Sequence, residues 1–120
     1  MRKLLCKAPA RFRKSFGFSW DGLRATFTKE ESFRLECIAG AALLAVLLLC
    51  PWPAWKRLIL AASFLLIPLV EVLNSAIEDI CNRITLNYDP GVKNAKDKGA
   101  LTVLLAIILN AVVVAALLAA

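Results

Sequence analysis

The fold is decided by the stretch Ala100-Leu-Thr-Val-Leu-Leu-Ala-Ile-Ile-Leu-Asn-Ala-Val-Val-Val-Ala-Ala-Leu-Leu-Ala-Ala120. These 21 residues contain two polar side chains, Thr102 and Asn110, and no charged one. A helix needs about 20 mainly apolar residues to cross the hydrocarbon core of a bilayer. The stretch therefore predicts a membrane-spanning helix.

Two further apolar stretches precede it. Cys37–Trp55 carries no charge over 19 residues, and Leu58–Val70 carries none over 13. After Val70 the apolar character resumes between polar residues until Cys81. The segment Pro51–Pro53 is long enough only for a tight turn, and its neighbouring tryptophans suit a membrane interface. Three spans are predicted, at about 35–55, 58–82 and 99–120.

The composition agrees with a membrane protein. The chain has 120 residues, of which 60% are hydrophobic and 20% charged, and 15 Lys+Arg against 9 Asp+Glu give a net charge of +6. A disordered chain is poor in apolar residues, and a soluble domain this small could not bury so much apolar surface. We therefore predict a single all-α integral membrane domain over residues 1–120.

The basic residues predict the orientation of the spans. Residues 1–34 carry nine Lys or Arg and residues 83–98 carry four, whereas the turn between the first two spans carries only Lys56 and Arg57. Basic residues accumulate on the cytoplasmic side of membrane proteins. We expect the N-terminus and a cytoplasmic loop, 83–98, on that side, and the C-terminus outside.

Residues 1–34 have the pattern of an amphipathic surface helix. Five apolar residues fall within about 80° of one another on a helical projection: Phe12, Phe16, Trp20, Leu23 and Phe27. A basic helix with an aromatic face typically lies in the membrane surface. Gly17 and Gly22 leave open an interruption of this helix, and packing on protein is the alternative. No recognition motif accompanies the basic residues, so no nucleic-acid partner is expected.

The second predicted span contains polar residues that share one face. With Glu71 at 0°, a helix places Asn74 at about −60°, Ser75 at about 40°, Glu78 at about −20° and Asn82 at about 20°. A carboxylate near the centre of a span costs about 2.5–3.5 kcal/mol. These carboxylates must therefore lie off-centre, face protein or water, or bind a cation.

The rise of a helix places these carboxylates near the cytoplasmic face. If the second span enters at Leu58, Glu71 lies about 20 Å deep and Glu78 about 30 Å deep, at the far edge of a hydrocarbon core of about 30 Å. We interpret one carboxylate as a general base and the other as a Mg²⁺ ligand. The alternative is a polar seam that joins helices in an oligomer.

The predicted loop offers groups that complement the carboxylates. Asn87-Tyr88-Asp89-Pro90-Gly91 reads as a turn, and Lys93, Lys96, Asp97 and Lys98 follow it. Lysines beside carboxylates suit a polyphosphate with a metal ion, although composition alone favours the interpretation of flanking charge at a membrane face. No phosphate-binding glycine loop of a known type occurs.

These motifs resemble those of the prokaryotic diacylglycerol kinases, a family that includes undecaprenol kinases. Glu71-Val-Leu-Asn-Ser-Ala-Ile-Glu78 is similar to the family signature, and Ser19–Ala25, Glu30 with Ser32–Arg34, and Ala95–Asp97 match at the expected spacing. The resemblance implies a homotrimer with three spans and one surface helix per subunit, in a bacterial inner membrane. It implies transfer of the γ-phosphoryl of MgATP to diacylglycerol, with undecaprenol as the alternative acceptor.

The resemblance also implies roles for individual residues. Glu71 would be the general base, Asn74 would position the reacting groups, and Glu30 and Glu78 would ligate Mg²⁺. The residues implied to contact ATP are Arg11, Phe18, Glu30, Glu78, Asn87, Tyr88, Asp89, Lys96 and Asp97. Those implied to contact the lipid are Arg11, Ser15, Trp20, Arg24, Phe27, Ser32, Arg34, Glu71 and Ala100.

The chain departs from the family pattern at one position of the polar face. The signature usually ends in a hydrophobic residue and Asp, whereas here Cys81 is followed by Asn82. One negative charge is therefore missing. A non-enzymatic membrane scaffold or a small oligomeric channel remains the alternative function, although Glu30, Lys96 and Asp97 lie outside the predicted spans and have no part in a helix seam.

Overall fold

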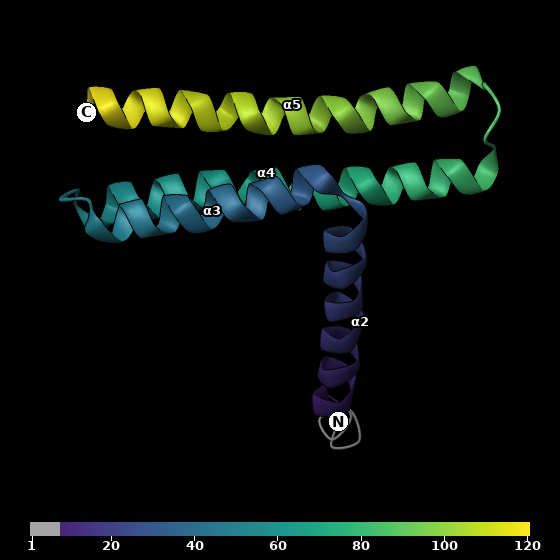
Figure 1. The fold of residues 1–120 in the computed structure, drawn as a ribbon, viewed down its shortest axis with the longest axis horizontal. Coiled ribbons are helices and arrows are strands. Elements are labelled where there is room, and N and C mark those ends of the chain that lie inside the picture. The colour runs from purple at the N-terminus through teal and green to yellow at the C-terminus, as the bar shows by residue number, and fades with distance from the viewer. Residues whose placement is uncertain (1–7) are drawn as a thin grey trace. The chain divides into compact units, whose positions relative to one another are not determined.

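The computed structural model describes residues 8–120, which form four helices (Figure 1). These helices are α2 (Ala8–Lys29), α3 (Glu31–Leu49), α4 (Ala54–Ile84) and α5 (Pro90–Ala119). The chain divides into one unit that ends at Glu31 and one that covers Ser32–Ala120, and each is described by itself. The predicted all-α fold is confirmed.

Three of the helices are long and apolar enough to cross a membrane. They are α3 with 19 residues, α4 with 31 and α5 with 30. At 1.5 Å per residue, α4 and α5 are each about 45 Å long, which exceeds a hydrocarbon core of about 30 Å. The chain is therefore a membrane protein whose two longest helices have ends that extend beyond the hydrocarbon.

The predicted cytoplasmic loop 83–98 is wrong in its extent. Helix α4 continues to Ile84 and α5 begins at Pro90, so only residues 85–89 connect them. Asp89 starts α5, because its side chain accepts a hydrogen bond from the Val92 N–H at 2.9 Å. An Asp cap followed by Pro at the first helical position is a favourable helix start. The lysines assigned to the loop therefore lie on the first turns of α5.

The turn between the first two spans is confirmed. Helix α3 ends at Leu49 and α4 starts at Ala54, so residues 50–53 make the turn. Pro51 and Pro53 explain the break, because proline lacks the N–H that a continuing helix needs. The first span thus ends earlier than the predicted residue 55, and Trp55 belongs to α4.

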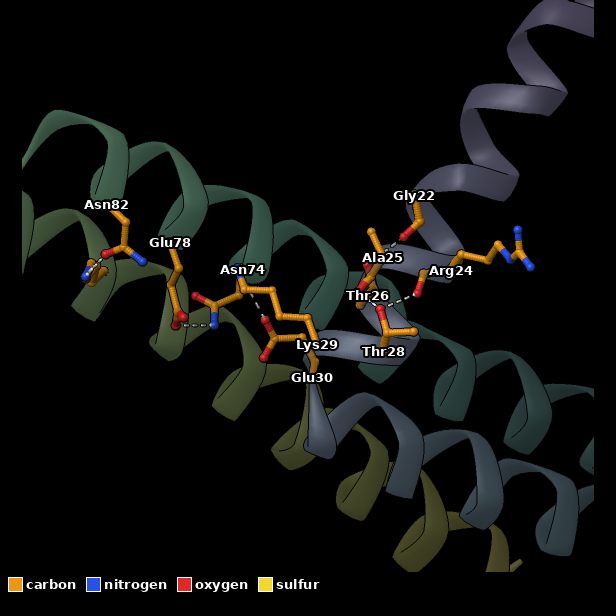
Figure 2. Close-up of polar contacts among 11 residues, drawn as sticks. Gly22, Arg24, Ala25, Thr26, Thr28, Lys29, Glu30, Asn74, Glu78 and Asn82 are labelled. Carbon is orange, nitrogen blue, oxygen red and sulfur yellow. Dashed lines mark hydrogen bonds and ion pairs between the residues drawn. The ribbon is translucent and has the colours of Figure 1, made fainter.

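Residues 8–29 form the continuous helix α2, so the two glycines do not interrupt it. Its C-terminal part carries side-chain bonds back to the preceding turn, from Thr26 Oγ1 to the Gly22 carbonyl at 2.9 Å and from Thr28 Oγ1 to the Arg24 carbonyl at 2.9 Å (Figure 2). The apolar stripe predicted for a surface helix is exposed along its whole length. It is thus available to contact a membrane surface.

Helices α3, α4 and α5 lie side by side in the second unit (Figure 1). We call the end that contains residues 50–57 and 113–120 the turn end, and the end that contains residues 78–97 the loop end. At the turn end, Leu47, Leu60 and Leu117 from the three helices form a buried cluster. Between the ends, Asn110 Nδ2 of α5 donates a hydrogen bond to Ser63 Oγ of α4 at 2.9 Å. The polar residue of the third span thus pairs across a helix interface, as such residues commonly do.

Candidate active site

The predicted polar face of the second span lies on α4, toward the loop end. Asn74 and Ser75 are buried, whereas Glu71 and Glu78 are half-buried. Asn74 Nδ2 donates a hydrogen bond to Glu78 Oε1 at 3.2 Å (Figure 2). The helical spacing of four residues makes this contact possible. The structure therefore joins the predicted positioning residue to one of the predicted metal ligands.

Asn74 packs against the backbone of α5 at Gly99. A Cβ atom added to Gly99 would overlap Asn74 Oδ1 and would lie 3.7 Å from Cδ1 of Ile77. Oδ1 of Asn74 is buried and has no hydrogen-bond partner in residues 8–120. Leaving such an acceptor unpaired costs roughly 1–3 kcal/mol. A buried amide oxygen without a hydrogen-bond partner, on a residue that lies between Glu71 and Glu78 in the sequence, marks a candidate functional position.

Asn82 connects the polar face of α4 to α5. Lys96 Nζ donates a hydrogen bond to Asn82 Oδ1 at 2.7 Å. On the adjacent turn, Lys93 and Asp97 form an ion pair. Asn82 is neutral, so it orients Lys96 without cancelling its positive charge. The position where the family pattern has a carboxylate is here a contact between α4 and α5.

A pocket of about 370 Å³ opens at the loop end. Its lining includes five of the residues that the resemblance assigns to ATP, and these are Asn87, Tyr88, Asp89, Lys96 and Asp97. Asp89 lines the pocket and also caps α5, because its Oδ1 accepts a hydrogen bond from the Val92 N–H. The structure thus brings these five residues together, and the pocket carries two lysines that suit a polyphosphate.

The other predicted site residues divide between the two units. On α2, Arg11, Ser15, Phe18, Trp20, Arg24 and Phe27 are all exposed. Glu30 follows α2, and Lys29 Nζ lies 3.9 Å from Glu30 Oε1 (Figure 2). In the second unit, Ser32 and Arg34 lie on the first turn of α3, and Ala100 lies on α5 beside Gly99. Participation of the α2 residues in a site with α4 stays a prediction.

Glu36 of α3 is a candidate that the sequence reasoning missed. Its Oε2 is buried with no hydrogen-bond partner in the described chain. It also lines an otherwise mostly apolar groove of about 430 Å³ between α3 and α4. An acidic residue just inside a predicted span was the available signal, but its contact with the second span depends on how the two helices pack.

The carboxylates are compatible with Mg²⁺. Within residues 8–120, no three His, Cys, Asp or Glu side chains gather at one point. Mg²⁺ at a nucleotide is commonly held by one or two carboxylates together with phosphates and waters, so a larger cluster is not required. Oε1 of Glu78 accepts the hydrogen bond from Asn74, and the other carboxylate oxygen is available to a cation. Glu78 therefore fits the role of a ligand.

Comparisons with known proteins agree with the family resemblance of the sequence motifs. The chain matches the family described as prokaryotic diacylglycerol kinase over residues 17–118. It is 45% identical over 101 residues to the diacylglycerol kinase of Escherichia coli strain K12, covering 82% of this chain and 80% of the relative. The diacylglycerol kinase of Pseudomonas aeruginosa is 37% identical over 90 residues, which are 75% of this chain and 73% of the relative. The chain belongs to the prokaryotic diacylglycerol kinase family.

Proposed function

We propose that this protein is an ATP-dependent lipid kinase that phosphorylates the hydroxyl of diacylglycerol and releases phosphatidic acid and ADP. The observation that carries the proposal is the polar face of α4, on which Asn74 joins Glu78 by a 3.2 Å hydrogen bond. This face continues to Asn82, which contacts Lys96 of the pocket at the loop end. A lipid hydroxyl at membrane depth and a water-soluble nucleotide can meet at such a place.

In the proposed reaction, Glu71 accepts the proton of the lipid hydroxyl. The hydroxyl oxygen forms a bond to the γ-phosphorus, and the bond between that phosphorus and the β,γ-bridging oxygen breaks, so that ADP leaves. Lys96 places a positive charge at the phosphates, where stabilisation of charge is the main requirement of phosphoryl transfer. Glu78 and Glu30 would hold Mg²⁺, which neutralises charge on the polyphosphate when bound. Asn74 fixes the orientation of Glu78.

We further propose that the loop end faces the cytoplasm of a bacterial inner membrane and that the chain assembles as a homotrimer. The count of basic residues supports this orientation, because nine lie in residues 1–34 and four in residues 83–98. The large exposed apolar surface of α3, α4 and α5 supports contact with lipid and with further subunits. ATP would then reach the pocket from the side where it is made.

Glu71→Gln tests the proposed reaction. Removing the general base is expected to lower turnover about 10²–10⁴-fold, measured as phosphate transfer from labelled ATP to diacylglycerol in lipid micelles. Glu31→Gln is the matched control, because Glu31 is an exposed carboxylate in the first turn of α3, and it should retain turnover. Helix content and oligomeric state are measured for both variants.

The acceptor is tested with a lipid panel. We expect faster transfer to diacylglycerol than to undecaprenol. Faster transfer to undecaprenol would replace the proposed substrate and keep the reaction. If the folded protein phosphorylates neither lipid, or if Glu71→Gln matches the control, the kinase mechanism is wrong and a scaffold or channel becomes the better explanation.

A further inference from the structure

A second groove lies between α3 and α4 at the turn end. It has a volume of about 280 Å³, and one charged residue, Arg57, lines it. The other lining residues are Leu44, Leu47, Leu48, Ala54, Leu58 and Ala61. An apolar groove with a single cation at its side has the character of a site for an amphiphile with a negatively charged head.

Within residues 8–120, Arg57 has no carboxylate partner. Its Nε is buried and has no hydrogen-bond partner in the part of the chain that the structure describes. The sequence has no acidic residue between Glu36 and Glu71. Glu71 lies 14 residues further along α4, which corresponds to about 21 Å. A buried donor without an acceptor costs roughly 1–3 kcal/mol, and more when the group is charged, so an anion from outside the described chain is the expected partner of Arg57.

The neighbours of Arg57 add to this requirement for an anion. The first turn of α4 contains Lys56 and Arg57 and no acidic residue, although the positive end of a helix dipole favours anions there. Lys56 Nζ lies 5.6 Å from the ring centroids of both Trp52 and Trp55 and donates a hydrogen bond to the Leu117 carbonyl at 3.1 Å. Tryptophans gather at the level of lipid headgroups. Lys56 and Arg57 are therefore expected at the depth of lipid phosphates.

We propose that the groove at the turn end binds an anionic phospholipid. The phosphate contacts Arg57, whose planar guanidinium matches phosphate oxygens in pairs, and the acyl chain lies along the leucines of the groove. Basic pockets between spanning helices bind lipid headgroups in this way. The site goes beyond the proposed function, because Arg57 and Glu78 are 21 residues apart on α4, or about 32 Å. The lipid bound here is not the lipid that is phosphorylated.

Quenching of tryptophan fluorescence by brominated lipids tests the proposal. Trp20→Phe is introduced first, so that Trp52 and Trp55 remain as the reporters. The protein is placed in phosphatidylcholine vesicles that contain a minor fraction of chain-brominated phosphatidylglycerol or of chain-brominated phosphatidylcholine. We expect stronger quenching by the anionic lipid, and we expect Arg57→Gln to lower this preference about fivefold. Arg83→Gln, at the loop end, should retain it.

Several outcomes would overturn the site. Equal quenching by the two lipids would do so, as would a preference that survives in Arg57→Gln. Weak quenching by both lipids, unchanged in the variant, would mean that a second copy of the chain covers the groove. Arg57→Lys keeps the charge and should show an intermediate preference, which guards against a folding defect in the glutamine variant. Kinase turnover is measured in the chain that retains Trp20, because Trp20 is itself an expected lipid contact. Arg57→Gln should retain turnover there, so failure of the lipid site and failure of the kinase proposal remain distinct.

Discussion

Gly99 controls how closely α5 approaches the side chain of Asn74. The two residues are buried against each other, and no side-chain atom fits between them. Glu78 holds the amide nitrogen of Asn74 on the other side. The carboxamide is therefore fixed from two directions, which is the condition for a positioning group to hold a reactive geometry.

Gly99→Ala should disturb this arrangement. The added methyl overlaps Asn74 Oδ1, and overpacking of this kind costs typically about 1–3 kcal/mol. We expect a lower thermal unfolding temperature in micelles and a fall in kcat that exceeds any rise in KM for ATP. Gly17→Ala is the control, because nothing lies within 4 Å of a Cβ at Gly17, and helix propensity should leave that variant equal or slightly more stable. Equal behaviour of the two variants would contradict the role given to Gly99.

Asn82→Asp should strengthen the contact between α4 and α5. The new carboxylate would face Lys96 Nζ at the place where Asn82 Oδ1 accepts at 2.7 Å. An exposed ion pair contributes about 0.2–1 kcal/mol, and salt screens it. We expect a small rise in thermal stability at low salt that disappears at high salt. The rise should also be lost when Lys96→Met is present, and a gain that persists with Lys96→Met would exclude this contact as its cause.

At the scale of elements, the proposed nucleotide contact of Asp89 has to be distinguished from its role as the cap of α5. Asp89 lines the pocket at the loop end, and it also caps the helix that carries Lys93, Lys96 and Asp97. Loss of the cap would fray the turn on which these side chains lie. An alanine variant of Asp89 would bind ATP more weakly in either case, whether the carboxylate contacts the nucleotide or only caps the helix.

Comparison of Asp89→Ala with Asp89→Asn separates the two functions. Asparagine caps a helix about as well as aspartate, whereas alanine costs about 1 kcal/mol. If the cap is the main function, Asp89→Asn retains stability and KM for ATP, and Asp89→Ala lowers stability and raises that KM. Equal increases in KM for both variants, with stability retained in Asp89→Asn, would assign the carboxylate to the nucleotide instead.

The long apolar runs make the spanning helices predictable from the sequence. The residues at which the polar ends of these helices begin and end are not predictable in the same way. The run Ala100–Ala120 has no alternative to a spanning helix, but residues 90–98 are polar and carry no apolar period. Their sequence predicts a loop, although the Asp89-Pro90 pair is a helix start. Within one helix, spacing alone placed Asn74 beside Glu78. The contacts of Gly99 and Glu36 cross between helices and depend on packing that spacing within one segment does not determine.

At the scale of the molecule, polar chemistry is concentrated at the two ends of the Ser32–Ala120 unit. The loop end carries the carboxylates of α4 and the lysines of α5, whereas the turn end carries Lys56 and Arg57 with no acidic side chain. Between them, the bond from Asn110 to Ser63 is a polar contact deep in the bundle. In the two proposals made above, this separation would let one short chain react with a soluble nucleotide at one face and contact lipid headgroups at the other.

The four-residue turn 50–53 also constrains how the protein is made. A connection this short keeps the ends of α3 and α4 together, so we expect the two helices to enter the bilayer as one hairpin during biogenesis. In the proposed topology, Lys56 and Arg57 must then be carried across the membrane at the tip of that hairpin. Each basic residue resists this passage, and the apolar faces of two helices supply the driving force together. If α3 inserted without α4, the hairpin would be only half inserted and α4 would remain outside the bilayer.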